Sequence, residues 1–512
     1  MSALARIRAF HPEIAAWRQD IHAHPEIGFQ EERTAGFVAQ QLEAFGIEVH
    51  RRIGRTGVVG VLRNGARADA PGRRLGLRAD MDALPIAEAN TFAHRSRHEG
   101  RMHACGHDGH TAMLLGAARY LAQTRNFDGT VHFIFQPAEE GLGGALAMLA
   151  DALFERFPCD AIFGMHNRPK LPVGKFAVRS GPMMAGGAFF DIDIVGLGSH
   201  GARPEAGVDP VMVAVQVASA LQTIVSRNVR PVDTAVLSIT QLHAGDAYNV
   251  IPQTARLSGT ARAFSTPVMH LIGATMKRTA EGIAQAMGAR ASVDFRVNFA
   301  PVINDPEQAE FAAAVCSELV GSENVVRDPA LIMASEDFSF MLEKVPGCYL
   351  NIGNGDGEGA CEVHNPSYDF NDAALPLGSA FFARARELVV NEGGNRRNWL
   401  EKGIDIQARR VYVHIKPNAD GSNPRSGRHS KRRRVWVSAR TCRRFAVDTS
   451  VAMPYRSVER AVVSCGRTTR QFDDSGKGYR VISTRTMATV TGVLFLITFA
   501  TSIPAFVLYP RC

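Results

Sequence analysis

Short apolar runs end in polar motifs at four places in the first part of the chain. LGLRA (75–79) leads into DMDALP, VHFIF (131–135) into QPAEEG, AIFGM (161–165) into HNRP, and CYLNIG (348–353) into NGDGEGACEVHN. Such runs are typical of buried strands in a largely parallel sheet, although each alone is also compatible with a buried helix segment. Ligands of open α/β sheets bind beyond the carboxyl ends of the strands, so we expect these polar motifs to meet at one edge.

Helical spacing of apolar residues occurs between these runs. HTAMLLGAARYLAQT (110–124) has one apolar face, and LPLGSAFFARARELVVNE (375–392) follows the last predicted strand and can close the same domain. The pattern therefore predicts an α/β domain with a largely parallel sheet.

The middle of the chain has a different order of elements. The predicted strands are 187–196, 234–243, 255–264 and 291–299, and the predicted helices are 209–227 and 268–287. The order β-α-β-β-α-β is that of a ferredoxin-like α+β domain. Because strand CYLNIG follows this segment, we expect an inserted domain at 185–298 between two parts of the first domain, 1–184 and 299–394.

The charge balance reverses near residue 395. Residues 395–512 contain 23 Lys and Arg against 7 Asp and Glu, whereas residues 1–394 contain 35 and 43, and the whole chain has a net charge of +8. The basic tail includes GRHSKRRRVWV, which is typical of an arm for nucleic acid or acidic surfaces, or of a solvated run. Residues 487–509 carry no charge over 23 positions, enough to span a bilayer.

This tail is expected to lie outside the folded part of the chain that residues 1–394 form. We interpret it as read-through into unrelated sequence, or as an error of the gene model, in preference to a membrane tether. We expect no nucleic-acid partner, and membrane contact only if the apolar segment 487–509 is expressed.

The N-terminus and the cysteines indicate a cytoplasmic protein. MSALARIRAF leads into HPEIAAWRQD without the apolar region of a signal peptide. The eight cysteines show no regular spacing, and a reducing compartment would keep them as thiols. Cys105 is therefore expected to be a ligand or a nucleophile rather than half of a disulfide.

Residues 103–110 read HACGHDGH and concentrate side chains that bind metals. Cys105 and His107, two positions apart, can reach one ion from a loop, although many such pairs are structural. The pair alone therefore does not decide between a metal site and a structural role.

Further ligand types follow the other predicted strands. Glu139 and Glu140 follow VHFIF, His166 follows AIFGM, and His364 follows CYLNIG. Each taken singly is also compatible with an ordinary solvated or hydrogen-bonded polar residue. Their joint occurrence at predicted sheet ends favours a metal site.

The chemistry of these side chains favours two divalent ions. Thiolate, imidazole and carboxylate suit Zn²⁺, with Mn²⁺, Co²⁺ or Ni²⁺ also possible. Five ligands exceed the need of one tetrahedral site, so we predict two ions with one ligand bridging. Paired metals activate a water and polarise a carbonyl, and one glutamate of the Glu139–Glu140 pair can serve as the base because adjacent side chains on an extended segment point different ways.

Taken together, the motifs resemble a known family of metal-dependent amidohydrolases. RADMDALP, HACGHDGH, PAEEG, GMHN, GSHGARP, YNVIP, ASEDF and the late His364 occur in the order found in hippurate hydrolase, N-acyl-amino-acid amidohydrolases and indole-acetyl-amino-acid hydrolases. The resemblance covers roughly residues 10–393. It implies hydrolysis of the amide bond of N-acyl amino acids, two divalent ions (Zn or Mn first, Co or Ni possible), and a homodimer formed through the inserted lid domain.

The resemblance also implies roles around the metal site. Glu139 matches the general base. Asp82 in DMDALP matches an acidic residue that contacts the metal ligands rather than the metal itself. The matching metal ligands are Cys105, His107, Glu140, His166 and His364.

Three residues of the inserted domain match groups that contact substrate. His200 in GSHGARP matches a histidine that reaches the substrate, in relatives across a dimer interface. Asn249 in YNVIP and Arg262 resemble groups that hold the scissile carbonyl or the substrate carboxylate.

Two other classes of function remain as alternatives. Cys105 could be the nucleophile of an amidase, activated by a nearby histidine. The protein could instead associate with a membrane or nucleic acid through the tail from residue 395.

Overall fold

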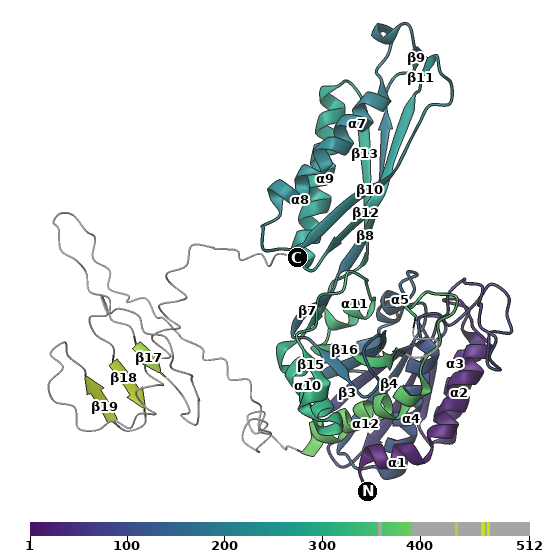
Figure 1. Ribbon diagram of the computed structural model, residues 1–512, viewed down its shortest axis with the longest axis vertical. Coiled ribbons are helices and arrows are strands. Elements are labelled where there is room, and N and C mark those ends of the chain that lie inside the picture. The colour runs from purple at the N-terminus through teal and green to yellow at the C-terminus, as the bar shows by residue number, and fades with distance from the viewer. Residues whose placement is uncertain (357–360, 392–435, 439–461, 466–467, 472–512) are drawn as a thin grey trace, which may run out of the picture. The chain divides into compact units, whose positions relative to one another are not determined.

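The computed structural model describes residues 1–356, 361–391, 436–438, 462–465 and 468–471 (Figure 1). The described residues up to 391 belong to a first unit of the chain, and those from 436 onward belong to a second. Within the described residues no helix is long and apolar enough to cross a membrane. The apolar segment 487–509, with most of the expected basic tail, lies outside them.

The second unit contains three short described strands, which the sequence pattern did not predict. Strand β17 pairs parallel with β18, and β18 pairs antiparallel with β19. Their bounds are Trp436–Ser438, Val462–Cys465 and Thr468–Gln471.

The first unit is built on an eight-stranded sheet with the order β1-β2-β4-β3-β5-β16-β6-β15. Strands β4, β3, β5 and β16 in its middle are mutually parallel, while β1, β2 and β6 pair antiparallel with neighbours toward the edges. The four parallel strands are the four apolar runs, so the predicted largely parallel sheet is confirmed. The bounds are Glu48–Ile53, Gly57–Asn64, Arg74–Asp80, Gly129–Gln136, Ala161–Pro169, Phe176–Val178, Val325–Arg327 and Gly347–Gly355 for β1, β2, β3, β4, β5, β6, β15 and β16.

Helices cover both faces of this sheet because its strands are apolar on both sides (Figure 1). In β16, Leu350 packs into one core and the adjacent Tyr349 into the other. The first core is closed by α1 (Ala3–Ala9), α2 (His11–Ala23), α3 (Glu32–Ala44), α4 (His107–Thr124), α10 (Pro306–Val320) and α12 (Leu375–Asn391). The second is closed by α5 (Gly144–Ala150), α6 (Leu153–Arg156) and α11 (Phe338–Leu342).

Helix α4 is the buried centre of the first layer. It packs against α2, α3, α12 and β3. It begins three residues earlier than the apolar pattern predicted, at His107. His107 and His110 therefore share one face of its first turn, as residues three apart do.

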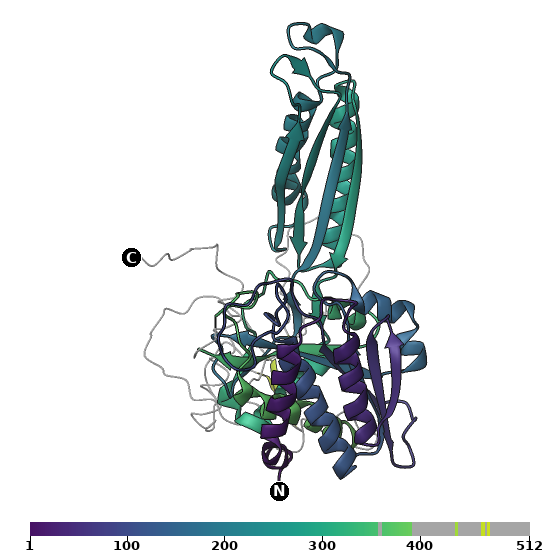
Figure 2. The ribbon, with the colours of Figure 1, turned by 90° about the vertical axis from the view of Figure 1, so that its right-hand side faces the viewer.

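A four-stranded antiparallel sheet of order β10-β12-β8-β13 forms the inserted domain (Figure 2). Its strands are β8 (Gly186–Val195), β10 (Ala235–Ala244), β12 (Thr254–Ala263) and β13 (Arg290–Phe299). Helices α7 (Pro210–Leu221), α8 (Thr223–Asn228) and α9 (Thr266–Ala286) share one apolar core with it. The predicted ferredoxin-like insertion is confirmed, whereas the boundaries after residues 184 and 298 remain predictions.

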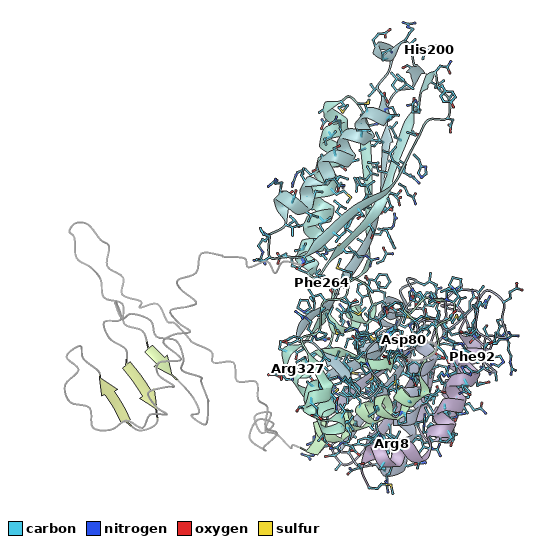
Figure 3. All side chains as sticks on the ribbon, viewed as in Figure 1. Arg8, Asp80, Phe92, His200, Phe264 and Arg327 are labelled. Carbon is cyan, nitrogen blue, oxygen red and sulfur yellow. The ribbon has the colours of Figure 1, made fainter. Side chains whose placement is uncertain are left out.

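The inserted domain has two distinct ends. At one end the chain enters and leaves beside the ladder of β7 (Gly181–Met184) and β14 (Val302–Asn304). At the other end β9 (Ser199–His200) pairs with β11 (Val250–Ile251). Figure 3 shows His200 and Phe264, which follows β12, at these opposite ends. The short 3-10 helices of this unit are Pro204–Ala206, Ser322–Asn324 and Asp372–Ala374.

Candidate metal centre

The structure brings the five expected ligands together at the carboxyl edge of the parallel strands. Three groups of side chains each place one ligand atom per residue within 4.8 Å of the others. These groups are Cys105 with His107 and His166, Cys105 with Glu140 and His364, and His107 with Glu139 and Glu140.

Cys105 belongs to two of these groups and links them. Its Sγ lies 3.3 Å from His166 Nε2 on one side. In the second group, His364 Nε2 lies 3.3 Å from Glu140 Oε1. The thiol thus stands between an imidazole pair and a carboxylate–imidazole pair, the position expected of a bridging ligand.

The glycine between Cys105 and His107 makes this approach possible. Gly106 has a φ of 94° and directly precedes helix α4, a backbone region that favours glycine. A Cβ at this position would lie 2.7 Å from the Tyr368 hydroxyl oxygen, nearer than such atoms can approach. The motif therefore needs a residue without a side chain here.

A backbone hydrogen bond brings His364 to the site from a distant part of the chain. Its N–H donates to the carbonyl of Ala104, at 2.7 Å, directly beside Cys105. His364 is also held at a φ of 69°, which is uncommon for a residue with a side chain. Its imidazole is half exposed, so the site is open to solvent on this side.

Asp82 orients two of the ligands. Its Oδ1 accepts from His107 Nδ1 at 3.2 Å, and its Oδ2 accepts the backbone N–H of Glu140 at 2.9 Å. This leaves His107 Nε2 buried without a hydrogen-bond partner among the described residues. An imidazole whose Nδ1 is held by a carboxylate and whose Nε2 makes no hydrogen bond is the usual arrangement of a metal ligand.

The electrostatics of the site also fit a cation. Burial raises the pKa of Glu139 well above its usual range, and the carboxylates of Glu336 and Glu140 add to the shift. Burial lowers the pKa of His107, but the carboxylates of Asp80 and Asp82 outweigh it and raise that pKa to about 10. The carboxylates that contribute to both shifts place negative charge around these buried side chains, and divalent ions would offset it.

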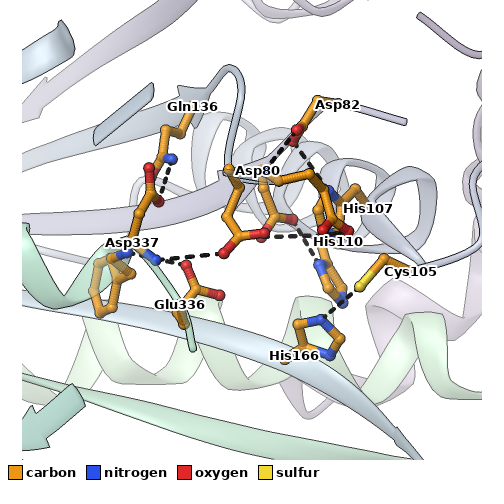
Figure 4. Close-up of polar contacts among 12 residues, drawn as sticks. Asp80, Asp82, Cys105, His107, His110, Gln136, His166, Glu336 and Asp337 are labelled. Atoms are coloured by element: carbon orange, nitrogen blue, oxygen red, sulfur yellow. Dashed lines mark hydrogen bonds and ion pairs between the residues drawn. The ribbon is translucent and has the colours of Figure 1, made fainter. Parts of the chain in front are cut away.

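Several buried residues of the site were not identified from the sequence (Figure 4). Asp80 accepts from His110 Nδ1 at 2.6 Å and pairs with Arg78 Nη1 at 2.8 Å. Glu336 and Asp337, from ASEDF, also pair with Arg78. The alternation of β3 was an available signal, since Arg78 and Asp80 fall on the same face of the strand.

The three expected substrate contacts of the inserted domain are separated. His200 is exposed on β9, opposite Val250 in the ladder with β11, and the neighbouring Asn249 accepts the N–H of Gly201 through its backbone carbonyl. Arg262 lies at the other end, where its Nη1 donates to Ser335 Oγ near the metal centre. Only Arg262 of the three is thus next to this chain's own site in the described structure.

Comparison with known proteins agrees with this geometry. Residues 76–387 match peptidase family M20/M25/M40. The chain belongs to this family. It is 43% identical to a hippurate hydrolase of Campylobacter jejuni over 384 residues, covering 75% of this chain and 98% of the relative. It is 39% identical to an N-acetylcysteine deacetylase of Bacillus subtilis over 388 residues, covering 75% and 98%.

Two solved structures share the fold. A dinuclear metal-binding M20 peptidase of Bacillus subtilis matches with a TM-score of 0.64 and 36% identity, covering 75% of this chain and 99% of the other. A putative aminohydrolase of Staphylococcus aureus matches with a TM-score of 0.71 and 28% identity, covering 75% and 98%. The expected family and fold are confirmed, and this M20 protein is a metal-dependent amidohydrolase.

We predict that Gly106→Ala destabilises this M20 enzyme by more than about 1 kcal/mol. The added Cβ meets both the unfavourable φ and the Tyr368 hydroxyl. Gly174→Ala is the matched control, because Gly174 has a φ of 90° but no atom within 4 Å of the position that an added Cβ would occupy. Thermal unfolding of both variants measures the difference. Equal losses of stability would show that the contact at Gly106 contributes nothing.

Proposed function

We propose that this M20 enzyme hydrolyses the amide bond of N-acyl amino acids. The names of its relatives support this substrate class, since hippurate hydrolase, N-acetylcysteine deacetylase and N-acyl-L-amino acid amidohydrolase all refer to acylated amino acids or their deacylation. The observation that carries the proposal is a buried glutamate, Glu139, within 4.8 Å of two expected metal ligands.

Two divalent ions, with Zn²⁺ or Mn²⁺ ahead of Co²⁺ or Ni²⁺, would be held by the five expected ligands. When bound, the ions would activate a water molecule and polarise the carbonyl of the scissile amide. Cys105 shares one of the ligand groups with His107 and His166 and another with Glu140 and His364. Asp82 would keep His107 and Glu140 in place.

Glu139 would act as the general base. Its raised pKa, caused by burial and by nearby carboxylates, suits a group that takes up a proton during the reaction. It would accept a proton from the attacking water and then donate it to the leaving amine. The backbone N–H of Asp337 donates to its Oε1 at 3.3 Å and leaves the other oxygen for the proton.

A cysteine nucleophile is less compatible with the site. Burial raises the pKa of Cys105 well above its usual range, and the carboxylate of Glu140 adds to the shift. Nucleophilic cysteines need a lowered pKa, because the thiolate is the reactive form. A bound cation would instead favour the thiolate as its ligand.

The geometry of the inserted domain supports a homodimer. Strand β8 has ten residues and thus spans ~30 Å, which separates His200 from the end of the domain that joins the metal-binding part. We propose that His200 and Asn249 act at the site of a partner subunit, while Arg262 binds substrate at its own. The enzyme would then comprise residues 1–394, with the tail 395–512 outside it.

We predict close to two divalent ions per chain in the purified protein. Replacing both Cys105 and His107 by Ala should remove most of the metal, because each of the three ligand groups contains at least one of these two residues. Cys159→Ala is the control, since this thiol contacts the Phe157 carbonyl outside the site. Elemental analysis gives the content. Full occupancy in the double variant would refute the ligand set.

We predict that the enzyme cleaves N-benzoyl, N-acetyl or indole-acetyl amino acids faster than unacylated dipeptides. Glu139→Gln should keep its metal and lose about 10²–10⁴-fold in turnover, because the amide cannot accept the proton. Rates on this panel, with metal content measured in parallel, test both statements. Preference for unacylated dipeptides would contradict the substrate class, and near-normal turnover of Glu139→Gln would contradict the base.

We predict that activity returns when two inactive variants are mixed. Glu139→Gln lacks the base and His200→Ala lacks the histidine, so a mixed dimer would contain one site with both groups. Subunits are exchanged under mild denaturation, and each variant treated alone is the control. If the mixture stays as inactive as its components, His200 does not act on a partner's site.

A further inference from the structure

The segment Ser335–Glu336–Asp337 connects the inserted domain to the expected base. Its first residue accepts a hydrogen bond from Arg262 of β12, and its last donates its N–H to Glu139 Oε1 at 3.3 Å. Because these contacts are only two residues apart, the segment joins Arg262 of the inserted domain to Glu139 by a short stretch of backbone.

The side chain of Asp337 fixes the direction of that N–H. Its Oδ1 accepts from Gln136 Nε2 at 2.7 Å, and its Oδ2 accepts the backbone N–H of Ala145 at 2.9 Å. Gln136 ends β4 and Ala145 lies in α5. The carboxylate is therefore held by two elements that flank the Glu139 loop on either side in sequence.

Glu336 fixes the middle of the segment. Arg78 Nη2 pairs with its Oε1 at 2.8 Å, and the Tyr349 hydroxyl donates to its Oε2. Arg78 reaches from β3, where it also pairs with Asp80 at 2.8 Å. The guanidinium of Arg78 thus holds both Glu336 of this segment and Asp80 at the end of β3.

The charges explain why Glu139 needs such support. Oxygens of Glu139, Glu336 and Asp337 lie within 4.8 Å of one another, and three carboxylates at this distance repel in a buried site. A base that rotated away from them would leave the attacking water, and a displacement of about 1 Å can cost about 10²-fold in rate.

A glycine opposite Arg262 makes room for the link to the inserted domain. Gly187 of β8 pairs with Arg262 in the strand register. A Cβ on Gly187 would lie 2.6 Å from Arg262 Nη1 and 3.0 Å from Ser335 Oγ. A larger residue would therefore separate the two partners while leaving both in the chain.

We propose that Ser335, Glu336 and Asp337 are positioning residues, which orient the Glu139 carboxylate and make its orientation depend on the inserted domain through the Arg262–Ser335 contact. This inference rests on the proposed role of Glu139 as the base. It assigns to the inserted domain a direct effect on proton transfer in its own chain, in addition to any contact with substrate.

A double-mutant cycle tests the proposal. Ser335→Ala and Gly187→Ala each break the link, and each should lower kcat about tenfold with metal content unchanged, whatever the displaced Arg262 does to KM. Ser335→Thr keeps the hydroxyl, so its kcat should be close to that of the unsubstituted enzyme. Ser339→Ala is the matched control, because the Ser339 hydroxyl is buried without a hydrogen-bond partner among the described residues and its loss should leave kcat unchanged.

The same substitutions in the Glu139→Gln background decide the mechanism. If the segment acts through Glu139, Ser335→Ala and Gly187→Ala should have no further effect on the residual turnover. A further tenfold loss there would overturn the proposal, as would a change in KM alone, which would indicate direct substrate binding. Full activity of Glu139→Gln by itself would instead refute the base, so the two failures are distinguishable.

Discussion

The burial of five carboxyl groups at the carboxyl edge of the sheet is the constraint on which the site depends. Asp80, Asp82, Glu139, Glu336 and Asp337 are all buried there. Buried carboxylates are unfavourable unless cations and hydrogen-bond donors surround them. Arg78 pairs with three of the five, and the metal ions expected in this family would supply further positive charge. Metal binding would therefore complete the electrostatics of the fold as well as its chemistry.

The same constraint explains how precisely the surrounding loops are held. The carboxylate of Asp82 accepts a hydrogen bond from the side chain of His107 and another from the backbone N–H of Glu140. The backbone N–H of His364 is fixed beside Cys105. Gly106 has no side chain at the point where the loop turns into α4. Each contact restricts a ligand before any ion arrives, which lowers the entropic cost of binding.

The two ends of the inserted domain have different relations to chemistry. The end near Arg262 contacts Ser335 and through it the neighbourhood of Glu139. The end that carries His200 and Asn249 is a full strand length away. The length of the strands thus places only one end of the inserted domain, the end with Arg262, beside this chain's own site in the described residues.

The sequence by itself determined the elements and the types of ligand. Apolar runs with polar ends predicted the four parallel strands, and the β-α-β-β-α-β order predicted the inserted domain, because strand and helix periodicity are local properties. The motif order predicted the family and named Cys105, His107 and Glu139. Only the tertiary structure showed that Cys105 lies in two ligand groups and that Arg78, Asp80, Glu336 and Asp337 form one network. Glu336 is 258 residues from Arg78, and pairing between buried charges so far apart depends on how the sheet is assembled, which no local pattern records.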